Sequence, residues 1–355
     1  MVPAMVRSFR FSVQASAPRP AAEWREIGRR AEDLGYSALS VSDHLDAEMA
    51  PLIALAVTAE ATRDLRLTTL VLGNDFRHPL FLAKQAATLD LLSDGRLELG
   101  LGAGWKTTDY DQSGIGLDRP RVRIARLAEA VEVLKRCFDE GPFDFDGEYY
   151  SVRGHDGQPT CIQSPHPPFL LAGGGRKMLT LAANAADIVG VNANMAAGVI
   201  DQRAGASATV EATDEKMGWI RDAAGDRIDN IELQTRVHMA QITDDPLGLA
   251  ELMAPALGLD AEAALASPHV LIGSIGQCVE TLLAWRERWG LTYIGLNEDS
   301  MVEFAPVVDA LAGVRFSGLR PIHRPGPVPG AGGPTRVRLR SGRCRPPCGR
   351  KVRPT

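Results

Sequence analysis

The chain has 355 residues, of which 45% are hydrophobic, and this is enough to build a large buried core. No apolar run approaches the ~18 residues that a membrane span needs, and the N-terminal MVPAMVRSFRF lacks the apolar region of a signal peptide, so we expect a cytoplasmic protein without a membrane partner. Residues 316–355 hold nine Arg, one Lys and no acidic residue. The rest of the chain therefore carries 29 basic and 44 acidic residues. This acidic balance argues against nucleic acid as the main partner of the protein.

The first 140 residues repeat a strand followed by a helix, with about 30 residues in each unit. Apolar periodicity and turn residues predict strands over 10–15, 37–42, 65–72 and 97–102, and helices over 22–34, 51–62, 79–92 and from Pro120 onwards. Strands that alternate with helices in this way indicate a parallel sheet with helical crossovers.

The repeat is interrupted at residues 141–168, where GPFDFDGEYYSVRG alternates aromatic and polar residues around Asp146-Gly147 and predicts an inserted hairpin. Further strands are expected over 169–172, 187–191, 230–242 and 292–296, and helices from Arg176 and over 204–224, 246–266, 276–289 and 301–311. Eight strands predict a (β/α)8 TIM barrel with insertions over residues 1–315. Residues 316–355, with eight Pro and seven Gly, are expected to be a disordered tail, and a basic nucleic-acid-binding tail is the alternative.

The stretch SDGRLELGLGAGW, residues 93–105, is the most distinctive part of the pattern. Leu97, Leu99 and Leu101 alternate with Glu98, Gly100 and Gly102, so one face of this strand is apolar and the other is nearly bare. The glycines either let a ligand approach the backbone or relieve crowding where the barrel bends.

Candidate site residues follow the predicted strands, because the working residues of such barrels lie at the carboxyl ends of the strands. Asp43-His44 ends the second strand, where a histidine can donate to a ligand or carry a proton; the alternative is a structural Asp–His pair. Gly73-Asn74 ends the third strand and predicts either a backbone bulge that supports a flat ring or an ordinary turn.

Two more candidates come later in the chain. Gly173, Gly174, Gly175 and Arg176 lie between a strand and a helix, where bare N–H groups and a cation predict an anion or phosphate site, or merely a tight turn. Asp109, in the loop after Trp105, is a candidate acid or base, and a solvated loop charge is the alternative. No set of His and acidic residues has the spacing of metal ligands at strand ends, so no metal site is predicted.

Several motifs together resemble the luciferase-like monooxygenase superfamily over about residues 10–313. They are SDGRLELGLGAGW after RHP and the AKQAATLDLL helix, Ser42-Asp43-His44, GEYYSV with SPHPP, and LAGGGRKMLTLAANAAD. The resemblance is nearest to the branch that uses the deazaflavin coenzyme F420. It implies a bacterial-luciferase-like barrel with Asp43 and His44 near the ring, Gly73-Asn74 behind it, Ala103-Gly104 lining it and Gly173–Arg176 at the phosphate.

The function implied by this resemblance is hydride transfer between F420 and a small organic substrate, with His44 as the donor to substrate or ring and Asp109 as a candidate acid or base. Many relatives carry Glu where Asp109 stands. An FMN-dependent monooxygenase that uses O2 and a separate reductase is the alternative within the fold, and a non-catalytic flavin-binding barrel is the alternative from another class. Barrels of this kind often pair, so a homodimer is expected, with the helix over 79–92 as a candidate contact face.

Overall fold

Eight parallel strands close into a barrel in the computed structural model, which describes residues 7–139, 141–199 and 202–312. The barrel strands are β1 (Arg10–Gln14), β2 (Ala38–Val41), β3 (Arg66–Thr69), β5 (Leu97–Gly102), β8 (Phe169–Gly173), β9 (Ile188–Val191), β10 (Glu232–Arg236) and β13 (Leu291–Asn297). Each pairs in parallel with its neighbours, and the β3–β5 pairing closes the ring. The predicted (β/α)8 barrel is therefore confirmed.

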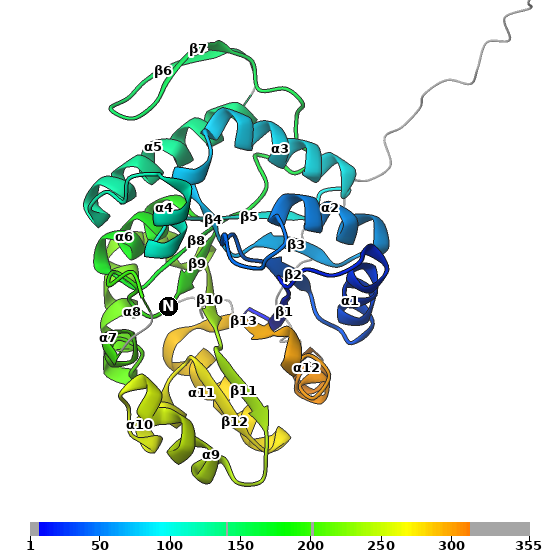
Figure 1. Cartoon of the computed structure of the whole chain (residues 1–355), viewed down its shortest axis with the longest axis vertical. Coiled ribbons are helices and arrows are strands. Elements are labelled where there is room, and N and C mark those ends of the chain that lie inside the picture. Colours follow the sequence, from blue (N-terminus) through cyan, green and yellow to red (C-terminus); the bar gives the residue numbers. More distant parts are fainter. Residues whose placement is uncertain (1–6, 140, 200–201, 313–355) are drawn as a thin grey trace, which may run out of the picture. The chain divides into compact units, whose positions relative to one another are not determined.

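Helices surround these strands (Figure 1) and cover their outward side chains. They are α1 (Ala21–Asp33), α2 (Pro51–Ala61), α3 (Pro79–Leu92), α4 (Thr107–Ser113), α5 (Pro120–Phe138), α6 (Arg176–Ala185), α7 (Gln202–Ala206), α8 (Val210–Ala224), α9 (Pro246–Met253), α10 (Ala261–Ala266), α11 (Ile275–Trp289) and α12 (Ala305–Ala312). Single 3-10 turns are η1 (Asn74–Phe76), η2 (Gly225–Asn230), η3 (Ala254–Leu257) and η4 (Glu298–Ser300). Proline at the first position of α2, α3 and α5 suits a helix start, where its missing N–H costs nothing.

The glycines of β5 make room for the chain itself. A Cβ at Gly100 would lie 1.8 Å from the carbonyl oxygen of Thr69, and one at Gly102 would lie 2.6 Å from the Val71 side chain. Thr69 and Val71 flank the break between β3 and the short strand β4 (Leu72–Gly73). The glycines therefore relieve crowding at this bend, and Gly102 in addition lines a cavity described below.

The inserted hairpin is present as β6 (Phe143–Asp146) and β7 (Ser151–His155), which pair antiparallel outside the helices near α5 (Figure 1). The Glu129 carboxylate of α5 accepts hydrogen bonds from the backbone N–H groups of Glu148, Tyr149 and Tyr150, at 2.8 to 3.3 Å. These bonds fasten the turn of the hairpin to the barrel.

The long strand predicted over 230–242 is wrong. The barrel strand β10 ends at Arg236, and the following β11 (Met239–Ile242) pairs instead with β12 (Val270–Gly273) in a separate two-stranded sheet. The polar His238 lies between the two strands, and an alternation of apolar and polar residues that continues to Ile242 concealed the change of partner. As a result the exit of this barrel strand lies six residues earlier than the sequence indicates.

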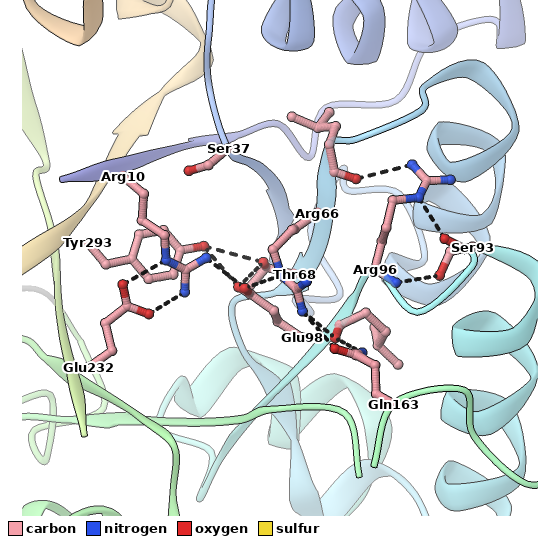
Figure 2. Close-up of polar contacts among 12 residues, drawn as sticks. Arg10, Ser37, Arg66, Thr68, Ser93, Arg96, Glu98, Gln163, Glu232 and Tyr293 are labelled. Carbon is pink, nitrogen blue, oxygen red and sulfur yellow. Dashed lines mark hydrogen bonds and ion pairs between the residues drawn. The ribbon is translucent and has the colours of Figure 1, made fainter. Parts of the chain in front are cut away.

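The amino-terminal end of the barrel is closed by buried ion pairs (Figure 2). Glu98 accepts from Arg10 Nη1 at 2.6 Å and from Arg66 Nε at 2.5 Å, and Glu232 binds Arg10 through both of its oxygens. Because β1 and β5 are not neighbours in the sheet, the Arg10–Glu98 contact crosses the barrel interior. Burial alone would raise the pKa of Glu98, but Arg10 and Arg66 lower it to about 2.

The tail expected over 316–355 lies outside the described residues. Helix α3 exposes Phe81 and Leu92, each by about 70%, together with the polar Lys84, Gln85 and Thr88. The homodimer stays a prediction. In the described part of the chain no helix combines the length and the apolar character of a membrane-spanning segment.

Candidate active site

Two adjoining cavities open at the carboxyl ends of the barrel strands. The first, of about 370 Å³, is lined by Gly102–Trp105 and by Gly173–Met178, and we call it the glycine-turn cavity. The second, of about 380 Å³, is lined by residues of several strand exits, among them His44 and Arg236, and we call it the barrel-mouth cavity. Both cavities share the same five residues, namely Trp105, Ala172, Asn192, Ala193 and Met195. One elongated molecule can therefore occupy both.

The predicted anion site lines the glycine-turn cavity. Gly173 ends β8, α6 begins at Arg176, and no side chain caps the helix, so the N–H groups of its first turn are open to a bound anion. A Cβ at Gly174 would lie 2.3 Å from the Ala193 carbonyl oxygen, which explains why this turn has to be bare. The exposed side chains of Arg176 and Lys177 add positive charge at the same wall.

Ala103 and Gly104 line the same cavity from the end of β5. Gly104 has a φ of +73°, and a Cβ there would lie 1.9 Å from the Tyr110 hydroxyl. The buried Arg123 guanidinium donates to the carbonyl oxygens of Ala103, at 3.1 Å, and Gly104. This wall is therefore held in one shape before anything binds.

His44 and Asp109 form a pair, although 65 residues separate them in the chain. His44 Nδ1 lies 2.7 Å from Asp109 Oδ2, and Asp109 Oδ1 also accepts from the Leu45 backbone N–H at 3.2 Å. Asp109 lies in the first turn of α4, not in a loop, and is only 2% exposed, so the alternative of a solvated loop charge is wrong. The Trp105 ring meets the His44 ring edge-on at 5.6 Å between centroids.

The contact between His44 and Asp109 decides which imidazole nitrogen is available to a bound molecule. A carboxylate at Nδ1 holds the imidazole in one orientation and favours a proton on that nitrogen, which leaves Nε2 as the atom that exchanges a proton with a bound molecule. His44 lines the barrel-mouth cavity, whereas Asp109 lines neither cavity. Asp109 is therefore a positioning residue that acts through His44.

Asp43, Gly73 and Asn74 lie away from both cavities. The Asp43 carboxylate binds Arg77 through both oxygens, at 2.5 and 2.8 Å, and accepts from the Gly73 N–H at 2.9 Å. Asn74 is buried and donates to the Tyr150 hydroxyl at 3.1 Å. These residues tie the exit of β2 to β4 and to the hairpin.

The residues of the β3–β4 connection that do line a cavity stand three positions before Gly73-Asn74. Leu70 and Val71, which are joined by a cis peptide bond, line the barrel-mouth cavity between β3 and β4. Apolar residues in an apparently continuous strand gave no sequence signal for this break.

The exit of β10 adds a polar group of cavity residues that the sequence analysis missed: Gln234, Arg236 and His238, with His269 before β12. Burial lowers the pKa of Arg236 to about 10 and that of His269 to about 4. The available signal was the alternation of polar residues from Glu232 to His238, which places these side chains on one face of the strand. It would have indicated site residues at a strand exit if the predicted strand had ended at Arg236. Among the described residues no group of three or more His, Cys, Asp or Glu side chains has the arrangement of a metal site.

A family model for luciferase-like monooxygenases matches residues 3–293, and the chain belongs to this family. An F420-dependent glucose-6-phosphate dehydrogenase of Amycolatopsis mediterranei is 30% identical over 177 residues, which are 47% of this chain and 51% of that protein. The oxygenase component of a flavin-dependent trigonelline monooxygenase of Acinetobacter baylyi is 30% identical over 122 residues, 34% of this chain and 33% of that protein. The chain thus covers about half or less of the length of these relatives.

Among solved structures, the coenzyme F420-dependent tetrahydromethanopterin reductase of Methanopyrus kandleri has a TM-score of 0.68 to this chain. The two are 19% identical, and the match covers 86% of this chain and all of that one. At this identity the likeness establishes the shared barrel and no more.

Proposed function

We propose that this protein is an F420-dependent oxidoreductase that transfers a hydride between the cofactor and a small organic substrate. The observation that carries the proposal is the pair of adjoining cavities, one with a bare glycine turn at a helix start and the other with His44 held by Asp109. The names of the F420-dependent relatives support this choice of cofactor.

The residues present fit such a cofactor. The N–H groups at the start of α6, with Gly173–Arg176, suit a phosphate, and no Cβ obstructs them. Leu70, Val71 and Trp105 offer the apolar and aromatic walls that a flat ring needs. When bound, F420 supplies the hydride chemistry, and the protein positions it and keeps water away.

His44 is the catalytic residue in this proposal. Its Nε2 hydrogen-bonds to the substrate or exchanges a proton with it, and Asp109 fixes the imidazole in the orientation that this requires. Trp105, which lines both cavities, packs edge-on against the imidazole.

A flavin-dependent monooxygenase is the second candidate, and the trigonelline monooxygenase relative favours it. The glycine turn and the apolar walls suit an FMN phosphate and ring equally well, because both cofactors present an anion and a flat ring.

Tryptophan fluorescence distinguishes these candidates. The full chain is titrated with F420 and separately with FMN, and Trp105→Phe assigns the signal to the shared wall. We expect micromolar binding of F420 and at least about tenfold weaker binding of FMN. The reverse order would favour the monooxygenase, and binding of neither would reject both. Bound F420 that is never oxidised or reduced by any donor or acceptor would indicate a non-catalytic binding barrel.

A further inference from the structure

The β10 side of the barrel-mouth cavity contains polar atoms without partners. Gln234 is 2% exposed, and its Nε2 has no hydrogen-bond partner among the described residues. The amide lies between two bare glycines of neighbouring strands: Cβ atoms at Gly190 and Gly295 would lie 3.0 Å from its Oε1 and 3.1 Å from its Nε2. A buried donor without a partner costs stability, so this side of the cavity holds polar groups that the chain itself leaves unsatisfied.

His269 presents a second such atom in the same cavity. It is 3% exposed, and its Nδ1 lies 2.9 Å from the Arg236 carbonyl oxygen, so Nδ1 carries the proton. Its Nε2 is therefore left as an acceptor, and this buried atom too lacks a partner within the described chain, beside the cavity that the residue lines.

Arg236 is the one Lys or Arg side chain among the described residues that line this cavity. Its hydrogen-bond partners are neutral: its guanidinium donates to Asn297 Oδ1 and to the Val237 carbonyl oxygen at 3.4 Å. No carboxylate of the described residues lies within ion-pair distance of it. A half-buried cation held only by neutral oxygens is incompletely compensated, and an anion is the ligand that balances it.

We propose that the substrate is a singly charged organic anion, a carboxylate, whose charged group binds Arg236. This inference rests on the proposed function and names its substrate class. Met195, Leu259 and Val270 line the cavity apart from the walls assigned to the cofactor ring, and they suit a hydrocarbon body.

The number of charges separates this substrate from a phosphate ester. A phosphate monoester carries nearly two negative charges at neutral pH. The cavity offers one cation, and the Glu48 carboxylate, which accepts from the His44 N–H at 3.1 Å, lines it as well. Arg236 can pair with one negative charge, and the second charge of a dianion would have no cation in a cavity that Glu48 also lines. A carboxylate is therefore the better match.

Calorimetric titration of the full chain without cofactor tests the inference, with benzoate, the uncharged benzamide and phenyl phosphate as probes at neutral pH. We expect benzoate to bind at least about tenfold more tightly than benzamide and no more weakly than phenyl phosphate. Equal binding of benzoate and benzamide, or a preference for phenyl phosphate, would overturn the proposal.

Variants then assign the preference to one side chain. Arg236→Met should bind benzoate and benzamide equally, Arg236→Lys should keep part of the preference, and Arg153→Met, on the exposed hairpin, should behave as wild type. A preference that survives in folded Arg236→Met would overturn the assignment; if that variant does not fold, the wild-type probe series and Arg236→Lys decide. Because these titrations contain no F420, failure of F420 to bind would reject the proposed function separately.

Discussion

The two ends of the barrel use the same strands in opposite ways. Along β10 the inward residues are Glu232, Gln234 and Arg236, and along β1 they are Arg10, Ser12 and Gln14. At the amino-terminal end the charges are paired with one another, whereas at the mouth Gln234 has an unpartnered amide and Arg236 has only neutral partners. The paired charges that stabilise the fold lie at one end, and the polar groups with incomplete partners lie at the other.

The difference shows how a barrel can keep its site open. A cavity lined by unpartnered polar atoms is costly, so the fold needs a region where the polar groups are complete. Glu98 provides it, since Arg10, Arg66, Thr68 and Tyr293 all contact its two oxygens across the interior. Substitutions at the amino-terminal end should therefore lower the free energy of unfolding. Substitutions at the mouth should mainly lower the activity.

The largest expected effect is that of Glu98→Gln on stability. The variant leaves the half-buried Arg10 and Arg66 without the buried carboxylate that they share, and removing one partner of a buried pair costs about 3 kcal/mol of unfolding free energy. Chemical denaturation at neutral pH measures it. Glu232→Gln, which removes the partly exposed partner of Arg10, should cost less. F420 affinity of the folded Glu98→Gln protein should be unchanged, and a loss of affinity with full stability would contradict the division between the two ends.

His44→Ala tests the mouth, where activity should change and stability should not. Loss of a group that transfers a proton should lower kcat about 10²-fold with the identified substrate, while the unfolding free energy changes by less than about 1 kcal/mol. His78→Ala is the matched control, because this exposed histidine at the start of α3 lies outside both cavities. Equal turnover in wild type and His44→Ala would remove His44 from the site.

Asp109→Asn should have a smaller effect, because it acts only through His44. The amide still accepts from the Leu45 N–H but no longer holds the imidazole with a charge, so we expect kcat to fall about tenfold with unchanged F420 affinity. A double-mutant cycle gives the sharper result: adding Asp109→Asn to His44→Ala should cost nothing further. Additive losses would show that Asp109 has a role independent of His44.

The sequence predicted the barrel because hydrophobic periodicity is local. The helix over 79–92 was predicted to the residue, and the hairpin followed from the turn at Asp146-Gly147. The errors occurred where periodicity carries no information about partners. The alternating pattern that continues to Ile242 does not reveal that β11 leaves the barrel to pair with β12.

The site was predictable only in position, not in its contacts. Strand exits indicated His44 and Gly173–Arg176, and both line cavities. The His44–Asp109 contact joins residues 65 positions apart, and no spacing rule relates them. Asp43 has the residue type and place of a ligand-binding group, yet the distant Arg77 occupies its carboxylate.

The smallest expected effect is a difference in how stability falls at acid pH between the wild type and Glu98→Gln. It distinguishes the contribution of the Glu98 charge from that of its packing. The pKa of Glu98 is about 2 in the folded protein, below the ordinary value of about 4.3 in an unfolded chain. A depressed carboxyl pKa stabilises the fold above the unfolded pKa, and this stability is lost as pH falls toward the folded pKa. Between pH 4.5 and 3.5 the wild type should therefore lose about 1 kcal/mol per pH unit more than Glu98→Gln. Denaturation curves at these two pH values measure the slopes, and parallel slopes would mean that packing around Glu98, not its charge, closes this end of the barrel.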